Sequence, residues 1–131
     1  MKLSSKTRYG LRACHVLAQN YKKTAISAST LEDMLGVSSK YLEQVMRKLI
    51  KSGIVGALRG ASGGYFLKKD PSLITVGDMV RALEPIEFVE CLKKDATCRC
   101  CPSSMVWKKL YDGINGVLDG MTLKEVAEGT I

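Results

Sequence analysis

The sequence predicts a mainly α-helical protein that carries one small β-hairpin. Hydrophobic residues recur at helical spacing in several separate stretches, aromatic residues make up only 6% of the chain, and one glycine-rich turn separates two short strand-like runs. The 131 residues, 46% of them hydrophobic, suit one compact domain with a modest core and a protruding element.

The first helix is expected over residues 5–21, and most of its surface is apolar. Its polar side chains form one narrow stripe at helical spacing, made of Arg8, Arg12, His15 and Gln19. A helix of this kind is buried on most sides, so the stripe must face solvent or a binding partner.

Two short helices with a tight turn between them follow. A capping box, Ser29 to Glu32, opens the first of them, and Gly36 ends it. The inward face of this first helix is expected to consist of Leu31, Met34 and Leu35. The second is expected over residues 39–52, with Tyr41, Leu42, Val45, Met46, Leu49 and Ile50 pointing inward. Its outer face is basic and rich in hydrogen-bonding groups. This pair predicts a helix-turn-helix whose second helix can read the edges of bases in the major groove of DNA.

Residues 54–58 and 65–67 are expected to form a hairpin directly after the helix-turn-helix, which is the position of a wing. Arg59 lies at the turn and could enter a narrow minor groove, while the glycines of residues 59–64 would let the tip approach a phosphate backbone. The glycine spacing fits neither of the common nucleotide-binding loops. The hairpin therefore favours DNA over a bound nucleotide.

The C-terminal part begins with a second capping box, Thr75 to Asp78, and a helix that stops before Pro85. A longer helix over residues 102–119 has Pro102 in its first turn. An apolar stripe runs along it, made of Trp107, Leu110, Tyr111, Ile114, Val117 and Leu118. This helix carries more apolar surface than a small winged helix can cover, so we expect a homodimer, the alternative being a helix folded back on its own domain. The predicted units are a DNA-binding domain over 1–84, a cysteine-bearing sensor loop over 85–101, and a dimerisation region over 102–131.

Charge is distributed unevenly along the chain. Residues 1–70 hold 13 Lys and Arg against 4 Asp and Glu, whereas residues 71–131 hold 7 against 9. A basic half joined to a mildly acidic half is typical of a nucleic-acid-binding protein. The sequence contains no apolar run of membrane-spanning length and no signal peptide, so we expect no membrane partner and a cytoplasmic location.

Four cysteines fall within eleven residues, at Cys91, Cys98, Cys100 and Cys101. In a cytosolic protein such a group indicates metal or redox chemistry before structural disulfides. Zinc normally takes two matched cysteine pairs, and the chain offers one, at 98 and 101. An oxidoreductase is disfavoured because no βαβ pattern surrounds that pair, and we expect no enzyme. Cys14, in the first helix, is expected to be a core thiol.

The chain resembles the Rrf2 family of bacterial transcriptional regulators over nearly its whole length. The matching stretches are residues 1–6, residues 38–44, the wing sequence of residues 58–67, and residues 75–78. The resemblance implies a homodimer on near-palindromic double-stranded operator DNA. It further implies that the major groove is read by Ser38, Tyr41, Glu43 and Gln44, that Arg59 contacts the minor groove, and that the interface includes Ser39, Lys40 and Gly60.

The chain is most similar to family members that hold an iron–sulphur cluster, [2Fe–2S] being favoured and [4Fe–4S] possible. The implied ligands are Cys91, Cys98 and Cys101, with Cys100 as the alternative to Cys101. Two departures stand out: only two residues separate Cys98 from Cys101, and no histidine follows the cysteines. A fourth ligand could be Cys100 or His15 from the partner chain. A cluster-free thiol sensor and a zinc site are the alternatives.

Overall fold

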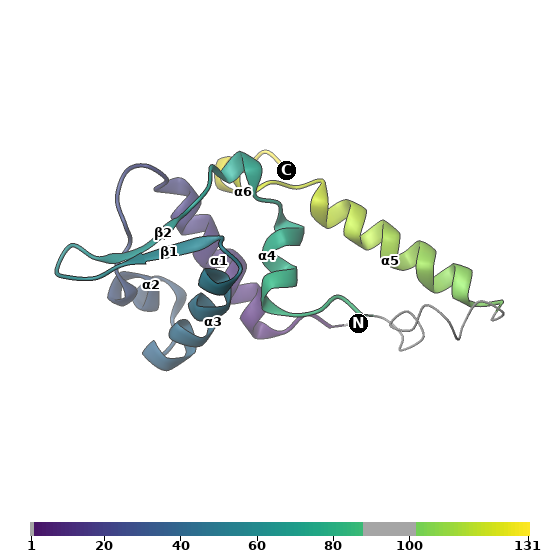
Figure 1. Cartoon of the computed structure of the whole chain (residues 1–131), viewed down its shortest axis with the longest axis horizontal. Helices are drawn as coiled ribbons and strands as arrows, with labels where there is room; N and C mark the ends of the chain where they lie inside the picture. The colour runs from purple at the N-terminus through teal and green to yellow at the C-terminus, as the bar shows by residue number, and fades with distance from the viewer. Residues whose placement is uncertain (1, 88–101) are drawn as a thin grey trace.

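The computed structural model describes residues 2–87 and 102–131, and it has the expected winged helix-turn-helix fold. Figure 1 shows a compact head and one helix, α5, that projects away from it. The elements in chain order are α1 (Ser5–Gln19), α2 (Ala28–Leu35), α3 (Ser39–Lys51), β1 (Val55–Leu58), β2 (Gly64–Leu67), the 3-10 turn η1 (Pro71–Leu73), α4 (Val76–Leu83), α5 (Ser104–Asp119) and α6 (Leu123–Glu128).

Side-chain caps determine where the helices of the helix-turn-helix begin. Ser27 caps α2 by accepting a hydrogen bond from the Thr30 N–H at 3.1 Å, so this helix begins earlier than the box at Ser29 predicted. Ser38 caps α3 in the same way, through the Tyr41 N–H at 3.2 Å. Gly36 adopts the left-handed conformation expected of it, with φ of 69°. Each cap satisfies an amide that the helix itself leaves free.

Helix α1 is the centre of the head, because it contacts α2, α3, α4, α6 and β2. Its Cys14 and Leu17 side chains are buried, together with Met46 from α3 and Met79 from α4. The core is therefore built from the inward faces that helical periodicity predicts. Two predicted inward residues are corrected by the structure: Met34 is 52% exposed and Ile50 is 39% exposed.

The hairpin is attached to the head through its second strand. Strands β1 and β2 pair antiparallel, with Val55 opposite Leu67 and Leu58 opposite Gly64. On the other edge of β2, Tyr65 exchanges two backbone hydrogen bonds with Ile26, at 2.8 and 2.9 Å. A Cβ on Gly64 would collide with the Ile26 backbone, so only glycine allows this close approach. The wing is thereby fixed to the loop that precedes α2.

The C-terminal helix α6 packs into the head against α1 and η1. Backbone hydrogen bonds hold it there, from Val76 N–H to the Met121 carbonyl at 2.8 Å and from Leu123 N–H to the Ile74 carbonyl at 2.9 Å. Leu123 is fully buried. The sequence predicts this segment as part of the dimerisation region, over 102–131, and in the structure it packs against α1 and η1 of the head.

Helix α5 has no buried residue, and it is apolar on two sides. One side, with Tyr111, Ile114 and Leu118, packs against the head. The other side is solvent-exposed in this single chain: Val106 is 59%, Leu110 42% and Val117 65% exposed. Within the described residues, no helix is long and apolar enough to span a membrane.

Candidate nucleic-acid interface

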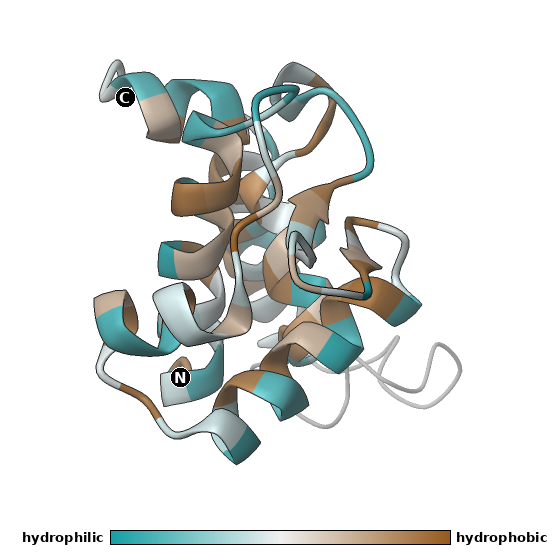
Figure 2. Cartoon of the chain, turned by 90° about the vertical axis from the view of Figure 1, so that its left-hand side faces the viewer, coloured by the Kyte–Doolittle hydropathy of each residue, from teal (hydrophilic) through white to brown (hydrophobic). Residues whose placement is uncertain are grey.

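The outer face of α3 is polar and open to solvent. Ser38, Ser39, Lys40, Glu43 and Gln44 are all exposed there, as helical periodicity predicts. Figure 2, which views the end of the molecule opposite α5, shows hydrophilic and hydrophobic segments alternating along the helices, as expected for helices with one buried and one exposed face. The Glu43 carboxylate accepts a hydrogen bond from Arg47 at 2.8 Å, one turn further along the helix. This pairing holds the carboxylate against the helix and partly neutralises it.

Tyr41 differs from its neighbours because it is half-buried. Its ring packs edge-on against the ring of Tyr9, with centroids 5.8 Å apart. Its hydroxyl forms a 2.7 Å hydrogen bond with Ser5 Oγ. These contacts tie the first turn of α3 to the start of α1. The resemblance implied a base-reading role for Tyr41, and the structure gives its side chain two contacts that position the helix.

Two arginines of the polar stripe of α1 lie beside Tyr9, which contacts the beginning of α3. The Arg8 and Arg12 guanidinium carbons lie 6.0 and 5.5 Å from the centroid of the Tyr9 ring, which itself contacts Tyr41. Arg12 also donates a hydrogen bond to the Met34 carbonyl at 3.3 Å, which connects α1 to α2. Arg8 and Arg12 of α1 are therefore grouped around Tyr9, whose ring contacts Tyr41 at the beginning of α3.

The tip of the wing presents Arg59 and Gly60 to solvent. Gly60 has φ of 102°, and nothing lies within 4 Å of where its Cβ would be. Gly63 and Gly64, in contrast, are required by contacts with the protein's own backbone. Of these three wing glycines, therefore, only Gly60 leaves open space at the tip. Near the base of the wing, burial and then the carboxylates of Glu43 and Glu32 raise the pKa of Tyr65.

The end of α4 contacts both α1 and α3. Glu84 Oε1 accepts hydrogen bonds from the Ser4 N–H at 2.9 Å and from Thr7 Oγ1 at 2.5 Å. Lys48 donates to the Leu83 carbonyl at 3.1 Å. Burial raises the pKa of Glu84, but the hydrogen bonds from Thr7 and Ser4 and the nearby Lys48 outweigh it, so the pKa is lowered.

The predictions from sequence missed these contacts at the end of α4. Glu84 lies 77 and 80 positions from its two hydrogen-bonding partners. No local pattern marks residues that are so far apart in the chain.

The predicted cofactor ligands Cys91, Cys98, Cys100 and Cys101 lie outside the described residues. His15 lies on α1 and is half-exposed. No group of three His, Cys, Asp or Glu side chains that could hold a metal occurs within residues 2–87 and 102–131. Cys14 is fully buried, and burial raises the pKa of its thiol to about 12, which confirms it as an unreactive core residue.

A helix-turn-helix followed directly by a β-hairpin defines the chain as a winged helix-turn-helix protein. The family model described as Rrf2, iron-dependent transcriptional regulator, matches residues 3–129. The chain therefore belongs to the Rrf2 family of transcriptional regulators, and this assignment confirms a regulator rather than an enzyme.

Two relatives and one solved structure illustrate the match. The HTH-type transcriptional regulator CymR of Bacillus subtilis (strain 168) is 37% identical over 131 residues, which cover 99% of this chain and 92% of that protein. The HTH-type transcriptional regulator IscR of Escherichia coli (strain K12 / DH10B) is 35% identical over 130 residues, covering 96% and 80%. The structure of CymR (YrzC), described as the global cysteine regulator of B. subtilis, has a TM-score of 0.81 and 34% identity, covering 100% and 99%.

Proposed function

We propose that this regulator binds operator DNA as a homodimer and that the cysteines of residues 91–101 control its affinity. The observation that carries the DNA-binding part is the continuous exposed polar face of α3, beside the basic stripe of α1 and the wing tip at Arg59. A helix of this kind fits the major groove, and a hairpin beside it reaches the adjacent backbone or minor groove.

The side chains of α3 divide by chemistry. Gln44 can form a bidentate pair with adenine, while Lys40 offers a cation to a phosphate or to guanine. Glu43 accepts a hydrogen bond from cytosine only if its bond to Arg47 is exchanged or shared. We infer that Glu43 adds specificity more than affinity, because an unmatched carboxylate in the groove repels phosphates and base acceptors.

The dimer would form through the exposed side of α5. Val106, Leu110, Gly113 and Val117 are separated by four, three and four residues, the spacing that puts them on one helical seam. No atom lies within 4 Å of the position that a Gly113 Cβ would occupy, so a second helix can approach closely there. A close contact between two helices would explain why glycine occupies position 113, where its low helix propensity is unfavourable.

An iron–sulphur cluster is the cofactor that the donor set fits best. Four thiols within eleven residues provide the soft ligands that iron–sulphur clusters take, and Cys91, Cys98 and Cys101 would hold it, with Cys100 or the partner's His15 as a candidate fourth ligand. When bound, the cluster would supply a centre that responds to oxidation and to iron supply. The family description names iron dependence, whereas the CymR structure is described as that of a cysteine regulator. A cluster-free thiol sensor is thus the second candidate.

The route from these cysteines to DNA would run through the end of α4. Leu83 and Glu84 immediately precede the cysteine-bearing segment, and they bind Lys48 of α3 and the start of α1 respectively. A conformational change in the chain beyond residue 84 would therefore be transmitted to α3, the recognition helix, and to the start of α1, which contacts α3. The cysteines are coupled to DNA binding only if the protein with the cofactor and the protein without it bind DNA with different affinities.

The test begins with anaerobically purified protein and measures visible absorption, iron and acid-labile sulphide. DNA binding is then compared before and after cofactor removal, on duplexes selected from a randomised pool. Charge-transfer bands with matched iron and sulphide, together with a change in affinity on removal, support the proposal. The triple variant Cys91→Ala, Cys98→Ala, Cys101→Ala should lose the cofactor but keep its fold. Equal affinity in the two states would refute the coupling, and iron-free protein that resists reconstitution would favour the thiol sensor.

A further inference from the structure

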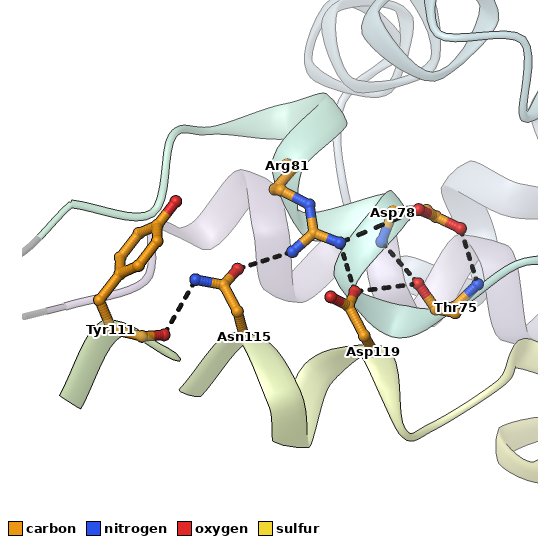
Figure 3. A network of polar contacts seen from close by, with 6 residues as sticks. All are labelled: Thr75, Asp78, Arg81, Tyr111, Asn115 and Asp119. Carbon is orange, nitrogen blue, oxygen red and sulfur yellow. Dashed lines mark hydrogen bonds and ion pairs between the residues drawn. The ribbon is translucent and has the colours of Figure 1, made fainter. Parts of the chain in front are cut away.

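The polar contact between α4 and α5 is centred on one arginine. Figure 3 shows the Arg81 guanidinium between the two helices, with Asn115 and Asp119 of α5 on one side and Asp78 of α4 on the other. Arg81 Nη1 donates to Asn115 Oδ1 at 2.7 Å, and Nη2 donates to the Asp119 carboxylate. The planar guanidinium can satisfy both partners at once, which a lysine ammonium on a flexible stem does less well.

The surrounding contacts make this a two-point attachment. At the C-terminal end of α5, Thr75 Oγ1 hydrogen-bonds Asp119 at 3.4 Å, and the backbone of Thr75 pairs with that of Thr122. One turn back along α5, Arg81 holds Asn115, whose amide in turn donates to the Tyr111 carbonyl at 3.0 Å. The first point lies at the end of the helix, and the second lies one turn back, beside the apolar contacts of Tyr111, Ile114 and Leu118 with the head.

Gly77 shows how closely the two helices approach. A Cβ at this position would occupy the space of the Asp119 carboxylate and crowd the Arg81 guanidinium. The residue is the second of α4, and the close approach of the two helices accounts for a glycine there. The polar contact of Arg81 and the glycine at position 77 thus belong to the same contact between α4 and α5, which we call the joint.

We propose that Arg81 is a positioning residue that sets the angle between the head and α5 and thereby the half-site spacing that the dimer accepts. This inference rests on the proposed dimeric DNA-binding function. Helix α5 has 16 residues and is therefore about 24 Å long. A tilt of about 10° at the joint moves its far end by about 4 Å, slightly more than the rise of one base pair, about 3.4 Å. Loosening the joint should therefore relax spacing selection by about one base pair.

The experiment uses the full-length dimer and a duplex that the wild type selects from a randomised pool. From the recovered two-half-site sequence, duplexes are made in which the spacing is changed by −2 to +2 base pairs, along with one isolated half-site. The spacing ratio is the affinity for the best spacing divided by that for a neighbouring spacing. We expect Arg81→Ala to lower this ratio at least fivefold with half-site affinity and dimerisation unchanged, a split that a purely structural defect would not produce.

Three further variants make the result specific. Arg81→Lys should resemble Arg81→Ala, because one ammonium does not hold Asn115 and Asp119 together. Gly77→Ala should also lower the spacing ratio, because its added methyl group would collide with Asp119 and Arg81 in the same joint. Lys124→Ala, which removes one positive charge from an exposed ion pair within α6, should behave like the wild type. If Arg81→Ala does not fold, Asn115→Ala tests the same contact.

Two outcomes would overturn the inference, and they are distinguishable. A spacing ratio within twofold of the wild type in both Arg81→Ala and Gly77→Ala would refute the role of the joint while leaving the regulator function intact. A wild-type protein that binds DNA without any preferred spacing would refute the dimeric mode of binding, and the inference with it.

Discussion

Replacing Glu84 tests whether the contact between α4 and α1 stabilises the DNA-binding head. In Glu84→Ala the Ser4 N–H and the Thr7 hydroxyl, which belongs to a residue only 3% exposed, lose their acceptor. Hydrogen bonds to a charged group contribute about 1.5–3 kcal/mol each, and two partly exposed ones at the lower end give a loss of about 3 kcal/mol. For a chain of this size, that corresponds to a fall in Tm of roughly 10 °C.

Glu84→Gln separates charge from shape. Both hydrogen bonds are accepted by the same oxygen, so the glutamine carbonyl can keep them at the strength of neutral bonds. The expected loss of unfolding free energy is therefore about 1 kcal/mol at pH 7. Thr7→Ser, which keeps the hydroxyl, should cost less than Thr7→Val, which removes it at constant size.

The pH dependence follows from the lowered pKa of Glu84. A carboxyl whose pKa is lower in the folded than in the unfolded state adds stability above its unfolded value, about 4.3, and loses it as the pH falls through the folded value. The difference between wild type and Glu84→Gln should therefore be full at pH 7 and smaller at pH 3.5, because the carboxyl is then mostly protonated in the unfolded state. Guanidinium denaturation at fixed protein concentration measures it. A difference that is the same at both pH values would refute the reasoning.

Three further changes test the dimer seam and the wing. Gly113→Leu should weaken dimerisation more than tenfold in sedimentation analysis, although it raises helix propensity by about 1 kcal/mol; an unchanged dimer would place the interface elsewhere. Arg59→Ala should lose affinity mainly at sites with a narrow minor groove, and an equal loss on all sequences would assign Arg59 to phosphate contact. Gly64→Ala should cost about 2 kcal/mol or more of unfolding free energy, because its methyl group meets the Ile26 backbone; a neutral effect would mean that the wing shifts freely.

The fold was predictable because its signals are local. Glycines and side-chain caps mark the helix ends, and apolar spacing marks the buried faces, as at Gly36 and Leu31. The errors also have local causes. Ser27 and Ser29 are both capping residues two positions apart, and periodicity alone does not choose between them. Met34 and Ile50 lie at the edges of helical faces, where an apolar residue can point either way.

The exposed residues of the candidate interface could be predicted from the sequence, but the contacts that position its helices could not. The exposed face of α3 follows from helical spacing, but the bonds of Tyr41 to Ser5 and of Arg81 to α5 join residues more than thirty positions apart. The apolar stripe predicted on α5 was a single feature in sequence, and folding divides it between the head and the outer seam.

The return of the chain to the head after α5 has a practical consequence for anyone who wants an isolated DNA-binding unit. Leu123 fills the core, and the strand-like pairing of Thr75 with Thr122 closes it, so the final residues are part of that unit although they come last in the sequence. Removing residues of α6 would therefore expose the interior of the head. An isolated head without α5 requires an internal deletion that joins the end of α4 to the segment before α6.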